Sequence, residues 1–392
     1  MSWTNQSFIN YCPTFASCMV RLILLLIFLL LSLLTYWRAP ALPLWYMAIL
    51  VAEFSWAFVA AVLLLLFLKI GGRYQMSGTL IGIAALLSLL SVTVRAMMVS
   101  ANVDKEFDAA YNITTPANAV QPYSIWRTFN GANEKQMVPQ ELNYVTYGDT
   151  SLKLDFYKSV QAGKRPCVVV IHGGSWKGGD SKQLPELNTH LAKEGYHVAS
   201  INYRLAPGAR FPAPIDDVAA TLKYLKANAE QLQIDTNQFV LLGRSAGAEI
   251  ALVSAYTLKD ASIKGVINYY GPADMIWGYH NPANRLVFNS CEVIEDYIGG
   301  TYKQLPELYA YSSSVAQVSK NIPPTLSIHG VTDPLCAYEH STRLEAKLKA
   351  VGAKHYLLTM PWATHGCDYT LYGPSGQLAT YTTDRFLKMV LQ

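Results

Sequence analysis

Charged residues are scarce in this chain: Asp, Glu, Lys and Arg make up 15% of the 392 residues, whereas apolar residues make up 51%. The formal net charge is +4, and the basic residues form no long run, so the composition does not indicate binding to nucleic acid. The six cysteines and eight histidines show no metal-ligand spacing, and no glycine-rich phosphate loop precedes a helix. We therefore expect no metal, no cofactor and no nucleic-acid partner.

The low charge is a property of the first hundred residues, which contain three long apolar runs, at about 21–37, 44–68 and 76–100. Each run approaches or exceeds the roughly 20 residues that cross a bilayer core as a helix. A signal peptide would explain only the first run, and nothing nearby could cover three buried helices. The sequence therefore predicts a membrane region at residues 1–101, with three transmembrane helices in contact with a lipid bilayer.

Basic residues outside these runs suggest how the chain crosses the membrane. With three spans, the N-terminus and the turn after the second span lie on the same side of the membrane, and this side carries Arg21, Lys69 and Arg73. The segment after the third span, on the other side, is mixed in charge. The positive-inside rule then predicts a cytoplasmic N-terminus and an extracytoplasmic remainder. Within the spans, Glu53 and Arg95 fall at similar depth, which favours a structural ion pair over a transport or ligand role.

The remainder of the chain divides into a connector and a larger domain. Residues 102–140 have few apolar runs and are predicted to form a tether, in which only 123–129 looks able to pack. From 141 to 392, strand and helix patterns alternate after a first hairpin, which predicts an α/β fold with a mostly parallel sheet. A stretch at about 272–321 interrupts the alternation and is predicted to be a cap-like insertion.

Gly243-Arg244-Ser245-Ala246-Gly247 is a serine framed by glycines at a predicted strand-to-helix turn. It follows the apolar run 239–242 and leads into helix-forming residues at 248–258. Such a nucleophile elbow is tight, and glycine on each flank removes side chains that would collide with neighbouring elements. The pattern also recurs by chance in glycine-rich turns, so Ser245 becomes a candidate nucleophile only together with partners.

Two candidate partners lie downstream of Ser245, in the chain order nucleophile, acid, histidine. Asp333 follows the strand-like run 324–328 and a glycine turn, and His365 follows the strand-like run 356–360. Both would lie on loops at the carboxyl edge of the sheet, where Ser245 also lies. Singly, Asp333 could be a helix N-cap and His365 an ordinary loop histidine. Jointly with the serine they favour a catalytic triad.

A fourth motif, His172-Gly173-Gly174-Ser175-Trp176, follows the apolar run 167–171. Glycines at this position let bare backbone amides approach a developing oxyanion. The amides of Gly173 and Gly174, with that of Ala246, are therefore predicted to form an oxyanion hole. His172 is expected to shape the loop by hydrogen bonding rather than to transfer a proton.

With these motifs the chain resembles the α/β-hydrolase carboxylesterases that carry a His-Gly-Gly-x-Trp oxyanion loop, near the hormone-sensitive-lipase-like and the feruloyl-esterase and kynurenine-formamidase-like groups. The resemblance covers about residues 143–392 and includes the segments 202–207, 211–217 and 270–274. It departs at Arg244, where a small, acidic or histidine residue is common, and at Cys367, where a larger apolar residue is common. Neither departure removes a catalytic group, so both concern substrate choice.

The resemblance implies an α/β-hydrolase domain at 141–392, with its sheet covered on both faces. The apolar runs place a bundle of three transmembrane helices before this domain. In that domain Ser245 would be the nucleophile, His365 the general base and then acid, and Asp333 the carboxylate that orients His365. We therefore expect a membrane-anchored serine carboxylesterase that forms an acyl-serine from small or lipid-like acyl esters. An acyltransferase using the same acyl-enzyme, and a catalytically retired membrane protein, are the alternatives.

Three tryptophans are candidates for substrate contacts. Trp176 and Trp362 flank the oxyanion loop and the base, and Trp277 lies in the predicted insertion. The other aromatic residues of the insertion could line an acyl pocket or equally form the core of a small cap.

Two cysteines lie close in sequence to the predicted acid and base. Cys336 follows Asp333 by three residues, and Cys367 follows His365 by two. Since the acid and the base must touch, these cysteines lie on adjoining loops, and an oxidising compartment would allow a disulfide between them. Two buried free thiols are an equally open alternative.

Overall fold

The structure of the chain, a computed structural model, describes residues 15–68, 74–114, 120–130 and 135–391. Its centre is a sheet in which the described strands follow the order β1-β2-β4-β3-β5-β6-β7-β8. The strands, in chain order, are β1 Gln140–Tyr147, β2 Thr150–Tyr157, β3 Arg165–Ile171, β4 His197–Ile201, β5 Ile234–Arg244, β6 Ile263–Tyr269, β7 Thr325–Gly330 and β8 His355–Met360. β2 is antiparallel to both of its neighbours, and the pairs from β4 to β8 are parallel. The predicted hairpin and mostly parallel sheet are confirmed.

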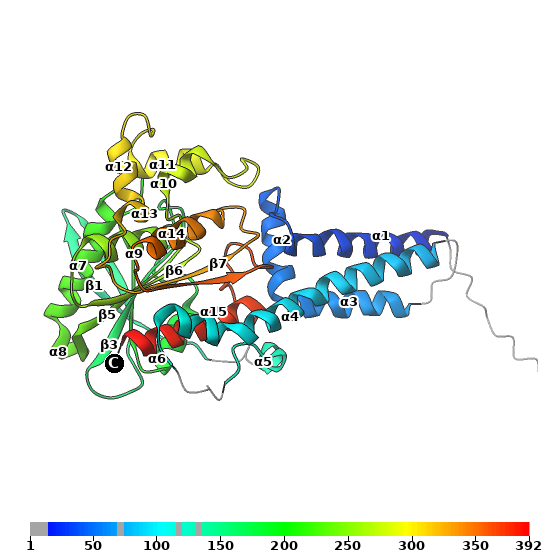
Figure 1. Cartoon of the computed structure of the whole chain (residues 1–392), viewed down its shortest axis with the longest axis horizontal. Coiled ribbons are helices and arrows are strands. Elements are labelled where there is room, and N and C mark those ends of the chain that lie inside the picture. The colour runs from blue at the N-terminus through cyan, green and yellow to red at the C-terminus, as the bar shows by residue number, and fades with distance from the viewer. Residues whose placement is uncertain (1–14, 69–73, 115–119, 131–134, 392) are drawn as a thin grey trace, which may run out of the picture.

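Helices cover both faces of the sheet, so the apolar side chains of the parallel strands are buried on each side (Figure 1). On one face lie α7 (Ala213–Ala227), α8 (Ala229–Leu232), α9 (Ala246–Thr257) and α14 (Glu339–Ala350). On the other lie α6 (Pro185–Lys193), α15 (Pro374–Val390) and the C-terminal half of α4. The carboxyl ends of β3, β5, β7 and β8 consequently meet at one edge, from which the loops with the candidate site residues emerge.

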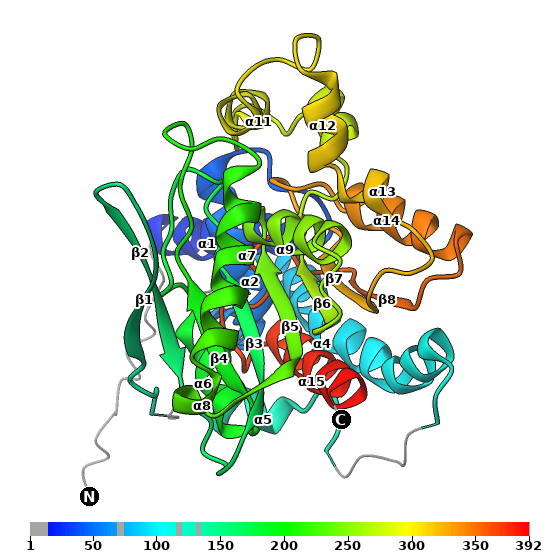
Figure 2. The ribbon, with the colours of Figure 1, turned by 90° about the vertical axis from the view of Figure 1, so that its left-hand side faces the viewer.

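The stretch between β6 and β7 contains four short helices that stand above this edge (Figure 2). They are α10 Met275–His280, α11 Ser290–Ile298, α12 Pro306–Ser312 and α13 Ser314–Gln317. The side chains of Tyr297 and Tyr309 are fully buried within the core that the insertion shares with α9. Some aromatic residues of the insertion therefore form the core of a small cap, whereas others, Trp277 and Phe288, line the cavity described below.

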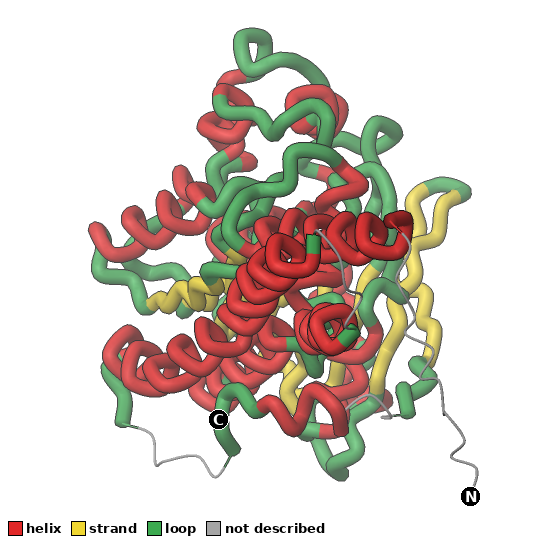
Figure 3. The backbone as a smooth tube through the Cα atoms, turned by 90° about the vertical axis from the view of Figure 1, so that its right-hand side faces the viewer, coloured by secondary structure: helices red, strands yellow, loops and turns green. Residues whose placement is uncertain are grey.

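The N-terminal region forms a helical bundle that projects away from the sheet (Figure 1). Its elements are α1 Phe15–Ser32, the short η1 Leu33–Thr35, α2 Leu42–Glu53, α3 Ser55–Phe67 and α4 Gln75–Tyr111. α1, α3 and the first half of α4 lie side by side, and α2 crosses their base. Seen from its free end, the bundle stands in front of the sheet (Figure 3). Leu25, Val62, Ala85 and Leu89 form its buried core, while many other apolar side chains are exposed.

Among the described residues, α4 alone is long and apolar enough to cross a bilayer by itself. α2 and α3 meet that test only as a pair, and they are bent by 86°. The apolar helix at Met19–Thr35 is shorter than the test requires. The prediction of three transmembrane helices is therefore wrong: one helix meets the criterion, or two if the bent pair is one span. The run at 44–68 does not form one straight helix, because its first half leaves the bundle axis and packs against α15.

Glu53, at that bend, and Arg95 do not pair with each other in the structure, so the predicted ion pair is wrong. Glu53 Oε2 accepts a hydrogen bond from the backbone N–H of Ser375, at the start of α15. The Arg95 guanidinium donates to the carbonyl and hydroxyl oxygens of Thr35 at 2.9 and 3.1 Å and lies over the ring of Tyr36. Each side chain thus hydrogen-bonds to the end of a nearby helix, Glu53 to the start of α15 and Arg95 to the end of η1, instead of pairing with the other.

The predicted tether is also corrected by the structure, because α4 continues past residue 100 into the α/β domain. Tyr111 donates through its hydroxyl to the carbonyl oxygen of Thr325 at 2.7 Å, and Phe107 packs edge-on against Tyr356 of β8. Arg385 of α15 forms ion pairs with Asp104 and Asp108. One continuous helix therefore connects the bundle to the sheet.

We expect Phe107→Ala to lower the free energy of unfolding of the α/β domain by about 3–5 kcal/mol, because it leaves a cavity between α4 and β8. Met98→Ala, on the same helix but with a side chain 63% exposed, should change it by less than about 0.5 kcal/mol. Urea unfolding of the full chain in detergent measures both. Equal effects of the two substitutions would contradict the packing of α4 on the sheet.

Candidate active site

The turn between β5 and α9 holds Ser245 in a conformation that side chains rarely adopt, with φ 51° and ψ −122°. A Cβ atom at Gly243 would lie 2.1 Å from the carbonyl oxygen of Gly247, and one at Gly247 would lie 2.2 Å from the carbonyl oxygen of Ile171. Only glycine fits at either position. The two glycines of the motif thus permit the tight turn, which places the Ser245 hydroxyl at the carboxyl edge of the sheet.

Ser245, His365 and Asp333 form a continuous hydrogen-bonded series. His365 Nε2 lies 3.0 Å from Ser245 Oγ, and His365 Nδ1 lies 2.7 Å from Asp333 Oδ2. A carboxylate oxygen can only accept, so Nδ1 carries the proton, and Nε2 of the neutral ring is left to accept from the serine hydroxyl. The structure thus brings the three predicted residues together in the geometry that a general base and its orienting acid require.

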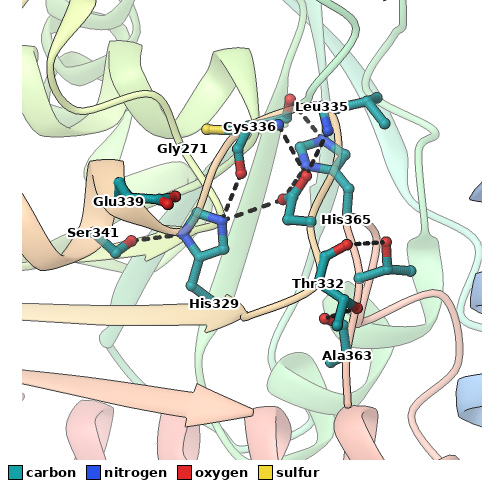
Figure 4. A network of polar contacts seen from close by, with 12 residues as sticks. Gly271, His329, Thr332, Leu335, Cys336, Glu339, Ser341, Ala363 and His365 are labelled. Atoms are coloured by element: carbon teal, nitrogen blue, oxygen red, sulfur yellow. Dashed lines mark hydrogen bonds and ion pairs between the residues drawn. The ribbon is translucent and has the colours of Figure 1, made fainter. Parts of the chain in front are cut away.

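Asp333 is fully buried, yet four donors hold its carboxylate (Figure 4). Oδ1 accepts from the backbone N–H groups of Leu335 and Cys336, and Oδ2 accepts from His365 and, at 3.2 Å, from His329 Nε2. Burial alone would raise the pKa of Asp333, but His365 and His329 lower it well below its ordinary value. The carboxylate is therefore ionised and can stabilise a positive charge on His365.

His329 is a positioning residue that the sequence did not reveal. Its Nε2 lies near two acceptors, Asp333 Oδ2 and, at 3.0 Å, the carbonyl oxygen of Cys336, so Nε2 carries a proton. Its Nδ1 lies 2.7 Å from Ser341 Oγ. His329 precedes Gly330 at the end of β7, and this second imidazole fixes the acid from the side opposite His365.

The loop after β3 differs from the prediction in one donor. The backbone N–H of Gly173 donates to Gln183 Oε1 at 2.7 Å and is therefore occupied, so its assignment to the oxyanion hole is wrong for this structure. Ser175, two residues on, lines the cavity beside Ser245 and Ala246. Gly174 has φ 120°, and a Cβ atom there would lie 2.1 Å from the carbonyl oxygen of Gly178. The backbone turns sharply at Gly174, and the next residue, Ser175, lies at the cavity that contains Ser245.

Trp176 is fixed by a carboxyl group that the sequence analysis did not single out. Its indole N–H donates to Glu249 Oε2 at 3.0 Å, and Tyr297 donates to the same oxygen at 3.0 Å. The indole stacks on the Tyr297 ring with centroids 4.3 Å apart. Burial raises the pKa of Glu249 to about 8, although the two hydrogen bonds lower it. Glu249 is therefore largely protonated at neutral pH, four residues after the nucleophile on α9.

Arg244, the departure from the family pattern, lies buried behind the nucleophile. Its Nε donates to Asp368 Oδ2 at 2.5 Å, and the hydroxyl of Tyr270 donates to the other oxygen of Asp368 at 2.5 Å. The Tyr270 ring lies 4.5 Å, centroid to centroid, from the ring of His365. Arg244 thus ties the elbow to the loop that carries His365.

A cavity of about 610 Å³ opens above Ser245 and His365. Trp176 and Trp277 line it, as predicted, together with Phe288, Ile294 and Leu335. Trp362 is not among its lining residues. The Trp362 ring is fully buried and donates to Ser375 Oγ at 3.0 Å, so its assignment as a pocket wall is wrong. In the loop after β8, the Trp362 side chain points into the core toward Ser375 and away from the cavity.

The N-terminal region contributes to the same site, which no motif in the sequence signalled. Arg38, Ala39 and Pro40, between η1 and α2, line the cavity. Trp45 of α2 donates through its indole N–H to the carbonyl oxygen of His365 at 3.0 Å. The segment before the α/β domain is therefore part of the wall and supports the loop of the candidate base.

Cys336 and Cys367 are free thiols in the structure, as in the second of the two alternatives. Both side chains are buried, and burial raises the pKa of each thiol well above its ordinary value. Buried thiols of this kind are unreactive.

The family model described as BD-FAE matches residues 154–348. Esterase LipC of Mycobacterium tuberculosis is 28% identical over 242 residues, which are 57% of this chain and 59% of that protein. Isoprenylcysteine alpha-carbonyl methylesterase ICME of Arabidopsis thaliana is 28% identical over 239 residues, which are 56% of this chain and 55% of that protein. The chain thus spans a little more than half the length of these curated relatives. The residues that the family model matches lie within the α/β domain.

Solved structures show the same fold. A structure described as a bacterial heroin esterase superposes with a TM-score of 0.58 at 22% identity and covers 75% of this chain and 92% of its own. An acetyl ester-xyloside bifunctional hydrolase from Caldicellulosiruptor lactoaceticus superposes with a TM-score of 0.54 at 21% identity and covers 65% and 98%. With the sheet order described above, these similarities identify the α/β-hydrolase fold.

Glu249→Gln tests the protonation of the buried carboxyl that holds Trp176. The pKa of Glu249 rises from 4.5 to about 8 on folding, so the folded state binds the extra proton between these values. The stability of the wild type relative to Glu249→Gln should be greatest below pH 4.5, fall as the pH rises toward 8 and stay level above it. Urea unfolding of both proteins across this range measures the difference. A difference independent of pH would contradict a neutral Glu249.

Proposed function

We propose that this protein is a membrane-attached serine carboxylesterase that cleaves small or lipid-like acyl esters through an acyl-serine intermediate. The observation that carries the proposal is the series Ser245–His365–Asp333, with distances of 3.0 and 2.7 Å, beneath an open cavity. A chemically complete series beneath an open cavity disfavours a retired hydrolase. The esterase names of the similar proteins support the same reaction class.

The chemistry follows from the atoms of the series. His365 Nε2 takes the proton of the Ser245 hydroxyl as the oxygen attacks the ester carbonyl, because a neutral serine is a poor nucleophile. Asp333 stabilises the imidazolium, which then gives the proton to the departing alcohol oxygen. An acyl-serine remains, and water activated by the same nitrogen hydrolyses it to release the acid and restore Ser245.

The oxyanion of each tetrahedral intermediate lies against backbone amides. We assign them to Gly174, Ser175 and Ala246, because the Gly173 amide is occupied by Gln183. Ser175 and Ala246 line the cavity on either side of Ser245. An amide aimed at the developing charge contributes roughly 2.7–4 kcal/mol to the transition state in comparable sites.

The apolar bundle is the proposed membrane attachment. Along α1, α3 and the first half of α4, exposed side chains include Leu30, Leu64, Phe67, Leu80 and Leu87. A patch of this kind is costly in water and favourable in lipid. In the sequence, Arg21 falls in α1, and Lys69 and Arg73 fall between α3 and α4; by the positive-inside rule these basic residues favour a cytoplasmic N-terminus and an extracytoplasmic catalytic domain.

Lipid-like esters suit this setting better than esters of sugars. The Arabidopsis relative is named for isoprenylcysteine, a lipid-bearing group. In this chain the lining residues of the cavity include Trp277, Phe288 and Ile294. Apolar acyl chains gain from contact with such walls.

Ser245→Ala should abolish labelling by a fluorophosphonate probe and lower kcat for ester hydrolysis on the order of 10⁶-fold, as loss of the serine does in a comparable triad. Ser254→Ala, on the same helix α9, should leave both unchanged. Gel fluorescence of the labelled proteins and hydrolysis of p-nitrophenyl acetate measure the two effects. Undiminished labelling of Ser245→Ala would show that another residue is the nucleophile.

Product analysis with a long-chain ester, with and without added alcohol, distinguishes hydrolysis from transfer. A free acid as the main product in both conditions is the expected result. A new ester as the main product would replace the carboxylesterase with an acyltransferase using the same acyl-serine.

Membrane attachment predicts that the full chain stays in the membrane pellet after an alkaline carbonate wash, because that treatment releases proteins held only by charge. With the proposed orientation, protease added outside sealed cells should cleave the catalytic domain. Release of the intact chain into the supernatant would contradict integral attachment, and protection from external protease would reverse the orientation.

A further inference from the structure

The mouth of the cavity is built from two segments that are far apart in the sequence. One is the stretch Arg38–Pro40 between η1 and α2, and the other is the loop at 281–288 between α10 and α11. The backbone N–H of Leu42 donates to the carbonyl oxygen of Leu286 at 3.0 Å, and Asn284 Nδ2 donates to the carbonyl oxygen of Pro40 at 3.2 Å. These bonds join the segments into one continuous rim, which we call the bundle-side rim.

Large apolar side chains are exposed on and beside this rim. Leu286 is 72% exposed and Trp37 is 64% exposed, and neither lines the cavity. Trp126 of α5 (Ile125–Asn130), 73% exposed, lies on the same side of the domain, because the ring of its neighbour Phe129 packs against Trp56 at the start of α3. Aromatic rings of this kind gather at the headgroup boundary of a bilayer.

The position of these side chains relative to the bundle identifies what covers them. Figure 1 shows α2 and α5 at the level where the bundle leaves the α/β domain. The rim continues directly into α2, and the bundle beyond it exposes apolar side chains along its length. If the bundle lies in the bilayer, a membrane surface at its base reaches the rim and α5 together. A separate protein partner would have to contact the rim, α5 and the base of the bundle at the same time.

The rim carries two basic residues, Arg38 and the exposed Arg285 beside Leu286, and of these two only Arg38 is in an ion pair among the described residues. Arg38 and Glu339, which both line the cavity, form an ion pair at 2.5 Å with each side chain nearly half exposed. Because Arg38 and Glu339 neutralise each other, an uncharged acyl chain can pass them without contacting an unpaired charge of either residue. An anionic substrate would have to compete with Glu339 for Arg38. The cavity wall at this pair therefore suits a neutral, lipophilic ester, while Arg285 lies outside the cavity lining.

We propose that the bundle-side rim is a bilayer-facing entrance, through which an uncharged lipophilic ester passes from the headgroup region directly into the catalytic cavity. Leu286 and Trp37 immerse the rim in the headgroup layer, and Arg38–Pro40 form the wall along which the acyl chain enters. The proposal rests on the proposed esterase function and names its substrate class: esters that partition into the bilayer before they reach Ser245.

The test compares one ester in water with one in the bilayer. The full chain in phosphatidylcholine vesicles is assayed with p-nitrophenyl acetate and with p-nitrophenyl palmitate carried in the vesicles. Leu286→Asp should lower kcat/KM for the palmitate about tenfold, which corresponds to roughly 1.4 kcal/mol, and leave that for the acetate unchanged. Val160→Asp is the matched control, because Val160 is 62% exposed and follows β2 at the opposite edge of the sheet. It should change neither value.

Two outcomes overturn the entrance. Unchanged hydrolysis of the palmitate by Leu286→Asp shows that the ester enters elsewhere, and an equal loss for both esters shows that Leu286 only supports the cavity. If the wild type hydrolyses neither ester, the proposed function fails instead, and a measurement without catalysis remains. A bimane fluorophore on Leu286→Cys should be quenched by nitroxide-labelled lipid, with Val160→Cys and labelled wild type as controls. Absence of quenching at 286 overturns the entrance independently of activity.

Discussion

The buried carboxylate of Asp333 is the group on which the arrangement of the site depends. Without solvent, its charge persists only because four donors from β7, its following loop and the β8 loop converge on two oxygens. That requirement fixes the distance between the ends of β7 and β8. It also fixes the orientation of His365, whose other nitrogen must then reach Ser245. Packing of the parallel strands supplies the rigidity that keeps these distances constant.

Two further buried groups extend this control to the neighbouring loops. The Arg244–Asp368 pair joins the elbow to the loop of His365, and Glu249 holds Trp176 at the end of the oxyanion loop. An unpaired charge on Arg244 or Asp368, or an indole N–H of Trp176 without an acceptor, would be costly in the interior, so these contacts restrict the loops to one arrangement. The site is thus assembled from buried polar contacts as well as from the sheet itself.

The N-terminal region is structurally continuous with this site. α4 carries the bundle directly onto the sheet, Trp45 supports the loop of His365, and Arg38 forms part of the cavity wall. A flexible tether would have left the bundle and the catalytic domain free to move relative to each other. The continuous helix instead gives the cavity mouth a fixed direction relative to the apolar bundle, and this fixed direction is what makes a membrane-facing entrance physically reasonable.

Local sequence patterns were sufficient to predict the α/β fold, the elbow glycines and the grouping of Ser245, Asp333 and His365, because strand periodicity and tight-turn sterics act locally and the carboxyl ends of parallel strands share an edge. The contacts that depend on the approach of distant segments became visible in the folded chain alone. The Gly173 amide donates to Gln183, the Trp362 ring lies in the core, Glu53 and Arg95 have separate partners, and the run at 44–68 is bent by 86°. Each of these outcomes was set by which polar groups met once the chain had packed, and a linear pattern of residue types does not contain that information.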